Sequence, residues 1–488
     1  MKQFGRNSVV VSAVVLLTLS VHSAAAASLP RLRISENKHF FVKEDGSPFL
    51  YLADTNWGLL GLTREEADSY LKDRAAKKFT VMQAVVLHGR GLDARNAYGQ
   101  TVFIDNDTKR PNEAFFQHVD YVVDRAADLG IYMALLPLWG DIFITQGYSL
   151  LDKSSAYSYG RFLGGRYRDK PVIWILGGDC YPDGVEDIWR AMAAGISEGD
   201  SGKNLKTYHP RGLLTSSAWF HREAWLDFNM IQSGHVILNR GYETIASDYA
   251  LTPAKPVVDG EAGYEGIAES LVNFKPGDKV IGPQDVRRIA YCDLFAGAAG
   301  YAYGSHWIWD YYANRKEKGS YGIPDVPLQE ALARAGGSQL QYLRNLMESR
   351  PMLDLVPDQR LVASDPGSTT DRVEACRASD GSYAFVYTAS GKPFAVRLRL
   401  PGIDLVAGKV IRAYWYDPRR GTAVHIEDFT KPDLDWLTAY LNRVYTPPRD
   451  SSLDKPNPYA ALLTVENDWV LVLEDASKNF VPPGAKRQ

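Results

Sequence analysis

The stretch from Val172 to Asp179 constrains the fold of this chain more than any other. It reads Val-Ile-Trp-Ile-Leu-Gly-Gly-Asp, an unbroken apolar and β-branched run that ends in two glycines and a carboxylate. Such a run is typical of a strand that is buried on both faces of a parallel sheet. A second stretch, Pro256–Glu261, has the same order of residue types. Because the carboxyl ends of the strands of a parallel barrel face one site, these two acids can meet there.

Short apolar runs alternate with helical patterns along the first two thirds of the chain. The eight predicted strands are Phe49–Ala53, Val81–Leu87, Tyr132–Leu138, Val172–Leu176, Leu213–Ser217, Met230–Ser233, Val257–Val258 and Tyr301–Gly304. Helices are predicted between them, and Thr63 with Glu66 forms a capping-box signature at the start of the first. This alternation predicts an α/β fold, a (β/α)8 TIM barrel over residues 28–352. A doubly wound open sheet is the alternative, but no GxGxxG or Walker A motif opens a helix.

The pattern changes at about Asp354, where period-2 runs such as Tyr383–Tyr387 and Ala395–Leu400 begin. These runs, separated by turn residues, predict a small antiparallel β-sandwich over residues 353–477. The remaining tail, residues 478–488, contains two prolines and three basic residues and is expected to fray.

The first 27 residues have the features of a signal peptide. Lys2 and Arg6 are followed by the mostly apolar run Val9–Leu19 and by three alanines that form a cleavage pattern. No Cys lies near this point, which argues against a lipoprotein, and an uncleaved anchor is the alternative. We therefore expect a protein that is secreted or periplasmic and that leaves the membrane after cleavage. The net charge of −3 gives no sign of a nucleic-acid partner, and three cysteines cannot form a disulfide framework.

Asp179 and Glu261 are the predicted catalytic residues. Glycoside hydrolysis needs a proton donor for the leaving oxygen and a second carboxylate on the other face of the sugar. The two strands lie on roughly opposite sides of an eight-stranded ring, so their ends can flank a sugar. The alternative is that either acid caps a helix or pairs with an arginine. Asp259 and Glu265 are nearby acids that could instead support the site.

Other polar and aromatic residues also stand at or near the predicted strand ends. We interpret them as substrate-binding residues: Asp54, Asn56, Trp57, His88, Trp139, His209, Gln232, His235, Tyr264, His306 and Trp307. Asp54 with three of the histidines could bind a metal, but the first strand lacks a His-x-His pair, so we expect no metal and no cofactor. Ser216 is not in a GxSxG elbow, which argues against a serine hydrolase.

These residues stand in motifs that resemble a known family. The chain is similar to the apiosidase-like barrel family, once labelled domain of unknown function 4038, which contains glycoside hydrolase family 140. The similarity covers residues 30 to 350, and the later part resembles the domain usually paired with that barrel, which is labelled collagen-binding. The motifs are Asp54–Trp57, Arg110–Glu113, Leu136–Asp141, Trp174–Asp179, Tyr208–Gly212, Trp225–His235, Asp259–Glu261, Phe295–Gly300, Trp415–Arg419 and Asp468–Leu473.

The resemblance implies a retaining glycosidase with Asp179 as acid/base and Glu261 as nucleophile. It also implies cleavage of apiose linkages in a pectic polysaccharide or oligosaccharide. Two alternatives stay open at this point. One is another furanosidase or an endo-glycanase, such as an arabinofuranosidase; the other is a non-catalytic protein that binds a glycan or a matrix protein. The exact sugar, exo or endo action and the oligomeric state do not follow from the sequence.

Overall fold

A computed structural model describes residues 29–88, 91–145, 150–268, 279–309, 326–431, 442–449 and 467–487. The predicted signal peptide lies outside these residues. Within the described part of the chain, no helix is both long enough and apolar enough to cross a membrane.

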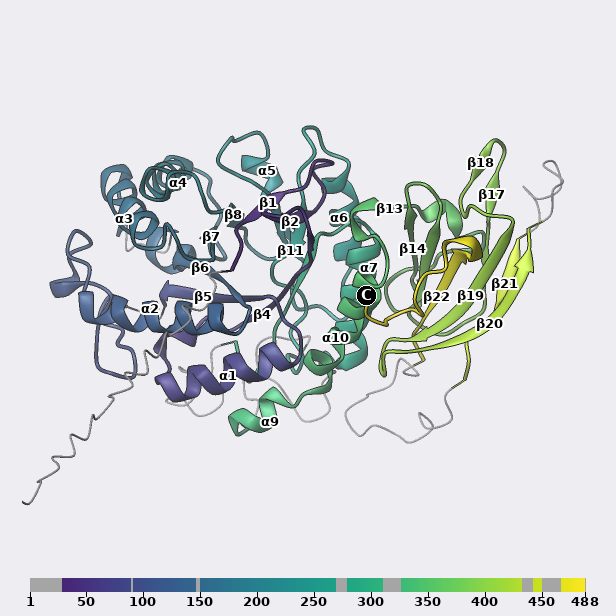
Figure 1. Cartoon of the computed structure of the whole chain (residues 1–488). Helices are drawn as coiled ribbons and strands as arrows, with labels where there is room; N and C mark the ends of the chain where they lie inside the picture. Colours follow the sequence, from purple (N-terminus) through teal and green to yellow (C-terminus); the bar gives the residue numbers. More distant parts are fainter. Residues whose placement is uncertain are drawn as a thin grey trace, which may run out of the picture.

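Eight parallel strands form a nearly closed barrel (Figure 1). In chain order they are β4 (Tyr51–Thr55), β5 (Val81–Leu87), β6 (Tyr132–Leu138), β7 (Val172–Gly177), β8 (Lys206–His209), β10 (Asn229–Gln232), β11 (Val257–Asp259) and β12 (Gly300–Tyr303). β12 pairs in parallel with β4, which closes one side of the ring. On the other side, the Asp227 amide next to β10 donates to the Lys206 carbonyl of β8 at 2.9 Å. The predicted barrel is confirmed.

Helices surround this barrel, and a small antiparallel sheet precedes it (Figure 1). The capping box predicted at Thr63 and Glu66 is present at the start of the first helix. The small sheet contains β1 (Leu32–Ile34), β2 (Phe41–Lys43) and β3 (Pro48–Phe49). The helices are α1 (Arg64–Ala76), α2 (Glu113–Asp128), α3 (Lys153–Arg166), α4 (Glu186–Asp200), α5 (Ser217–Phe220), α6 (Gly241–Tyr249), α7 (Pro283–Phe295), α9 (Leu328–Leu332) and α10 (Ala335–Glu348).

The fifth barrel strand differs from the prediction. It is β8, and the predicted stretch Leu213–Ser217 instead gives the short β9 (Leu214–Thr215), antiparallel to β10, followed by α5. β8 reads Lys-Thr-Tyr-His and has no apolar run, yet all four residues are buried. The Thr207 hydroxyl donates to the Phe228 carbonyl at 2.7 Å, and the Lys206 ammonium donates to the Asn204 carbonyl at 2.9 Å. Hydrogen bonds compensate the burial of its polar side chains, so this strand can be buried without an apolar run. A search for apolar runs therefore does not find it.

Antiparallel sheets follow the barrel, as predicted. One six-stranded sheet has the order β13-β14-β15-β22-β19-β20, and the pairs β16–β21 and β17–β18 stand apart from it. A separate apolar core between them includes Phe394, Trp415 and Trp469. The strands are β13 (Leu355–Pro357), β14 (Val373–Ala378), β15 (Tyr383–Thr388), β16 (Phe394–Val396), β17 (Arg399–Leu400), β18 (Ile403–Asp404), β19 (Val410–Asp417), β20 (Thr422–Thr430), β21 (Arg443–Tyr445) and β22 (Trp469–Asp475).

The other face of the six-stranded sheet packs on helix α7 of the barrel (Figure 1). The ring of Tyr291 stacks on Tyr387 with centroids 5.0 Å apart. Beside this stack, Arg287 of α7 forms a buried bidentate ion pair with Asp468, with N–O distances of 2.8 and 2.7 Å. Apolar stacking and a fully paired charge therefore hold the sheet on the barrel.

The C-terminal tail packs on the rest of the protein, so the expectation that it frays is wrong. The Arg350 guanidinium donates to the Val481 carbonyl at 2.9 Å. The same guanidinium lies over the Phe480 ring at 4.9 Å. Arg350 is buried and also pairs with Glu474 of β22 at 2.5 Å. The guanidinium that binds the tail is therefore itself neutralised by the six-stranded sheet.

Candidate active site

The turn after β7 brings Asp179 close to β8. Gly177, Gly178 and Asp179 have φ values of +86°, +108° and +48°. A Cβ on Gly177 would lie 2.4 Å from the His209 carbonyl oxygen, and the Gly178 amide donates to that oxygen at 3.0 Å. Only glycine permits this close passage of the two backbones. The turn therefore fixes Asp179 in the left-handed region, beside the end of β8.

Two histidines from different strands meet the carboxylate of Glu261, which follows β11. His209, at the end of β8, has its Nε2 atom 3.0 Å from Glu261 Oε2. His235, in the loop after β10, has its Nε2 atom 3.0 Å from Glu261 Oε1. Each carboxylate oxygen thus has one imidazole partner, and the carboxylate is 5% exposed. This arrangement holds the Glu261 carboxylate in one orientation.

The surroundings move the pKa values of the two acids in opposite directions. Burial alone would raise the pKa of Glu261, but hydrogen bonds and positive charge from His209 and His235 lower it to about 2. Burial, together with the charge of Glu261, raises the pKa of Asp179 to about 6. Two carboxyl groups whose pKa values are pushed apart can act as one protonated acid and one ionised base or nucleophile in the same site.

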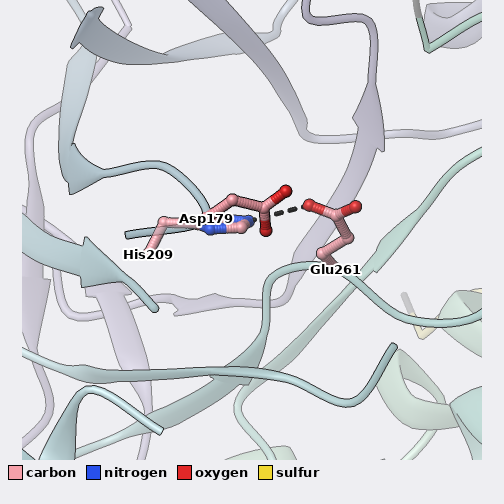
Figure 2. A group of neighbouring side chains, drawn as sticks. All are labelled: Asp179, His209 and Glu261. Carbon is pink, nitrogen blue, oxygen red and sulfur yellow. Dashed lines mark ion pairs between the residues drawn. The ribbon is translucent and has the colours of Figure 1, made fainter. Parts of the chain in front are cut away.

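The two carboxyl groups lie close together. One oxygen of Asp179, one oxygen of Glu261 and a ring nitrogen of His209 all lie within 4.8 Å of one another. Figure 2 shows the Asp179 and Glu261 carboxyl groups facing each other, with the His209 ring beside them. Carboxyl groups of retaining glycosidases are about 5–5.5 Å apart, whereas those of inverting enzymes are about 6.5–9.5 Å apart.

Other predicted site residues gather around these three. The rings of Trp57 and Trp139 lie 5.6 and 5.8 Å from the His209 ring, between centroids. Gln232, at the end of β10, lies near Asp179 and offsets part of the rise in the pKa of Asp179. The Tyr264 ring lies 4.3 Å from the His235 ring, and its hydroxyl interacts with Glu261. The cluster therefore contains eight of the thirteen predicted residues: Trp57, Trp139, Asp179, His209, Gln232, His235, Glu261 and Tyr264.

Three further predicted residues stand at strand ends of the same barrel. His88 follows β5, and its burial lowers its pKa to about 4. His306 and Trp307 follow β12, where the His306 amide donates to the Glu265 carbonyl at 2.8 Å. The Arg334 guanidinium lies 4.0 Å from the centroid of the Trp307 ring. Contact of these three side chains with substrate stays a prediction.

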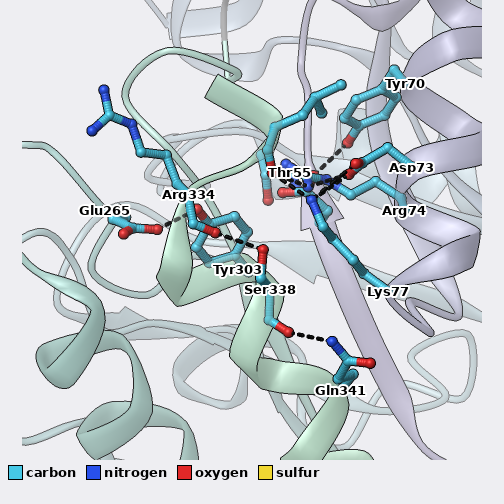
Figure 3. Close-up of polar contacts among 12 residues, drawn as sticks. Thr55, Tyr70, Asp73, Arg74, Lys77, Glu265, Tyr303, Arg334, Ser338 and Gln341 are labelled. Carbon is cyan, nitrogen blue, oxygen red and sulfur yellow. Dashed lines mark hydrogen bonds and ion pairs between the residues drawn. The ribbon is translucent and has the colours of Figure 1, made fainter. Parts of the chain in front are cut away.

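Asp54 is not part of the cluster, whereas contact of Asn56 with substrate stays a prediction. Along β4, Tyr51 and Thr55 hydrogen-bond Gln83 inside the barrel, so the residue between them at position 54 points outward. There Asp54 accepts from the Tyr70 hydroxyl at 2.8 Å and pairs with Arg74 of α1; Figure 3 shows Tyr70 and Arg74 in this network. Asp54 instead joins β4 to α1. Asn56 is fully buried two positions further on.

Sequence reasoning missed Gln83, which lies beneath the site. Its side-chain amide donates to Thr55 Oγ1 and to the Gly260 carbonyl, both at 2.9 Å. It therefore connects β4 and β5 to the residue that precedes Glu261. A single amide inside the apolar run Val81–Leu87 was the available signal, because a buried polar group needs hydrogen-bond partners.

Asp179, His209 and Glu261 also offer one possible ligand atom each to a metal ion. However, both oxygens of Glu261 already face imidazole nitrogens at 3.0 Å. A nitrogen that donates its proton to a carboxylate cannot at the same time bind a metal. The hydrogen bond between His235 Nε2 and Glu261 Oε1 therefore favours a hydrogen-bonded site over a metal site.

We expect metal removal to leave the activity of this site unchanged. Dialysis against EDTA, followed by assay in metal-free buffer, should give the same kcat as the untreated protein. Metal analysis of both samples serves as the control. A loss that returns only when Zn²⁺ is added back would contradict the hydrogen-bonded interpretation.

Comparisons with known proteins find two family matches and similar solved structures. The family described as "Apiosidase-like, catalytic domain" matches residues 35–354, and "Putative collagen-binding domain of a collagenase" matches residues 356–443. A solved structure named "Glycoside hydrolase" is 30% identical, with a TM-score of 0.78, over 93% of this chain and 98% of that one. A glycoside hydrolase family 5 structure from Bacteroides vulgatus ATCC 8482 is also 30% identical, with a TM-score of 0.80, over 93% and 95% of the two chains. No curated protein matches the chain.

Proposed function

Because this chain belongs to the apiosidase-like family of glycoside hydrolases, we propose that it is a retaining enzyme that cleaves apiofuranosyl linkages of a pectic glycan. The observation that carries this proposal is that one carboxyl oxygen of Asp179 lies within 4.8 Å of one carboxyl oxygen of Glu261. That separation supports a retaining mechanism, since an inverting enzyme needs room for a water molecule between the acid and base.

The proposed reaction uses the two acids in turn. Protonated Asp179 donates to the glycosidic oxygen while the Glu261 carboxylate attacks the anomeric carbon, so the C–O bond breaks as the glycosyl-enzyme ester forms. Asp179, now ionised, takes a proton from water, and that water cleaves the ester and regenerates Glu261. The raised pKa of Asp179 and the lowered pKa of Glu261 favour these starting states.

The histidines and aromatic rings have supporting roles in this proposal. His209 and His235 hold the Glu261 carboxylate in position for attack and keep it ionised. Trp139 is only partly buried beside Asp179, so its ring can stack on the C–H face of a sugar. Tyr264, Gln232 and Trp57 complete the wall of the site.

The substrate can be tested with a panel of pectic oligosaccharides that carry apiofuranosyl or arabinofuranosyl linkages. Release of apiose, with retention of anomeric configuration in an NMR time course, would support the proposal. Release of arabinose alone would identify an arabinofuranosidase. No release from any member, with normal binding of the glycans, would contradict glycosidase action on pectin.

We also propose that the enzyme is exported, with residues 1–27 removed as a signal peptide. In this proposal a catalytic barrel spans 28–352 and a C-terminal unit spans 353–477; the family matches over 35–354 and 356–443 support a boundary between them. Mass spectrometry of the mature protein, recovered from the periplasm or medium, should find Ser28 at its N-terminus. Recovery only as the full-length chain in the cytoplasm would contradict export.

A further inference from the structure

A buried network of polar side chains lies behind the active site, between β11 and α7, and the mechanism above does not use it. We propose that Asp259 and Asp293 form a buried acid pair that shares one proton and positions His235 against Glu261. This inference rests on the proposed function. In this proposal Asp259, two places before Glu261, is a positioning residue. It acts on Glu261 through the loop that carries His235.

Asp259 anchors the start of the loop that carries His235. Its carboxylate accepts a hydrogen bond from the Ser233 amide at 3.3 Å and another from the Ser233 hydroxyl at 2.5 Å. Ser233 follows β10 directly, and Gly234 then donates its amide to the Glu261 carbonyl at 3.1 Å. Asp259 is fully buried, so no solvent competes for these bonds.

Asn239 and Arg288 anchor the end of the same loop. The side-chain amide of Asn239 donates to the Ser233 carbonyl at 3.1 Å and to the Gly234 carbonyl at 3.1 Å. Arg288 of α7 donates to the Asn239 carbonyl at 3.2 Å and to the Ile237 carbonyl. His235 therefore lies in a loop whose two ends are tied to each other, to Asp259 and to α7.

Asp293 of α7 is the partner of Asp259. A Cβ on Gly241 would lie 2.8 Å from Ser233 Cβ and 3.2 Å from Asp293 Oδ1, so Asp293 lies beside the residue that Asp259 binds. Both carboxyl groups are buried, and among the described residues no hydrogen-bond donor reaches the oxygens of Asp293. Two carboxylates cannot both ionise at such close range in an apolar setting. Because Asp259 accepts both Ser233 donors, the shared proton belongs on Asp293, which donates it to Asp259. Burial and the charge of Asp259 raise the pKa of Asp293 well above its usual range.

The other charged and titratable groups that face this pair fit that assignment. Arg288 is the cation on α7, and Glu374 of β14 is a further acid. Tyr301 of β12 and Cys292 of α7 also face the pair, and burial raises their pKa values well above the usual range, so both are neutral. Arg372 pairs with Glu374 at 2.7 Å, so a pair with one negative charge beside Arg288 leaves this region close to neutral, whereas a doubly ionised pair would add an uncompensated buried charge.

The consequence for the active site follows from the position of His235. Its Nε2 atom reaches Glu261 Oε1 at 3.0 Å, and its Nδ1 atom lies 3.1 Å from the Ala262 carbonyl oxygen. Both contacts require the loop to hold its present shape. A displacement of about 1 Å at a catalytic group can reduce rate by up to about 100-fold, so a loosened loop should reduce turnover even though Asp259 never touches the substrate.

The test is a double-mutant cycle between Asp259→Asn and His235→Ala, measured as kcat/KM on the released sugar. Asp259→Asn should lower kcat/KM by roughly tenfold or more. The double variant should be no worse than His235→Ala alone, because Asp259 acts through His235. Full activity of Asp259→Asn, or losses that multiply in the double variant, would overturn the proposal.

A second pair of variants tests the shared proton. Asp293→Asn keeps a donor toward Asp259 and should retain most of the activity, whereas Asp293→Leu removes the donor and should lose activity as Asp259→Asn does. Equal loss in both variants would overturn the assignment of the proton to Asp293.

Asp200→Asn is the matched control for general damage. Asp200 is a buried acid at the end of α4 that accepts from the Gly202 and Asn204 amides at 2.8 and 3.3 Å. This variant should lose stability without coupling to His235.

A readout without substrate separates this proposal from the proposed function. In protein labelled with ¹⁵N-histidine, the ring signals of His235 should move in Asp259→Asn and stay in place in Asp200→Asn. If the wild-type protein releases no sugar, the proposed function fails while this measurement still decides the role of Asp259. If the His235 signals do not move in Asp259→Asn, the positioning role of Asp259 is overturned.

Discussion

Replacing Glu261 with Gln is expected to reduce kcat by about 10⁴- to 10⁶-fold, because the variant lacks the nucleophile. The amide has almost the same shape, so substrate should still bind and KM should change little. An amide also has only one acceptor for two imidazole donors, His209 and His235. One of the two imidazoles then faces the NH₂ group of the new side chain without an acceptor. The free energy of unfolding should therefore fall by about 1–3 kcal/mol. Rate of sugar release and thermal unfolding measure the two effects.

Glu265→Gln is the matched control for this variant. Glu265 is a buried acid four residues further along, which accepts from the Tyr303 hydroxyl at 2.6 Å and from the Gly336 amide at 3.2 Å; Figure 3 shows Glu265 beside Tyr303. Its neutral variant should lose stability to a similar degree and keep kcat within about tenfold. Equal loss of kcat in both variants, or near-normal turnover by Glu261→Gln, would refute the assignment of the nucleophile.

Replacing Asp179 with Asn is expected to lower kcat/KM by about 10²- to 10⁴-fold on natural linkages, which need a proton for the leaving oxygen. The proposed mechanism requires Asp179 protonated, so the activity of the wild-type enzyme should fall as pH rises through about 6. It also requires Glu261 ionised, so activity should fall again only as pH drops toward about 2. In Asp179→Asn, the decrease in kcat/KM near pH 6 should be absent. A pH series of kcat/KM on both proteins checks this.

The same variant should be more stable than the wild type above pH 6. Asp179 has a folded-state pKa raised from 3.8 to about 6, so the folded protein holds that proton more tightly than the unfolded chain. Above pH 6 the ionised carboxylate therefore destabilises the fold, by up to about 3 kcal/mol, and a neutral Asn removes this cost. Below pH 4 the difference should vanish, because Asp179 is protonated in both states.

A substrate with an activated leaving group separates acid catalysis from general damage. An aryl glycoside with a weakly basic phenol needs no protonation, so Asp179→Asn should cleave its bond far better than it cleaves a natural linkage. The glycosyl-enzyme ester should then accumulate, because the base that activates water is missing. Equal losses on both kinds of substrate would contradict the role of Asp179.

The sequence could predict the barrel because most of its strands are apolar and follow one another at regular intervals. It could not predict β8, whose Lys206 and Thr207 are buried because they hydrogen-bond the carbonyls of Asn204 and Phe228. The same limit affected the site. The sequence placed His209 before a strand, whereas it ends one and faces Glu261. Its contact with Glu261 depends on the passage of Gly177 over the His209 backbone, which no local pattern contains.

Strand ends were a good guide to which residues approach the site and a poor guide to which way they point. Asp54 and Glu261 both end barrel strands, but the alternation along β4 turns Asp54 toward α1 and Arg74. Counting from Tyr51, which faces inward, would have placed Asp54 outward. The pairing of Asp259 with Asp293 joins residues 34 positions apart on different elements, so only the packing of α7 on β11 reveals it.

Helix α7 has consequences for how this protein can change over evolution. On one side its Arg287 and Tyr291 hold the C-terminal sheet, and on the other its Arg288 and Asp293 hold the loop behind the nucleophile. Exchange of the sheet for an unrelated module by recombination would leave Arg287 buried without Asp468, at a cost of about 3–5 kcal/mol. We therefore expect the barrel and the sheet to be inherited together, with Arg287 and Asp468 replaced only as a pair.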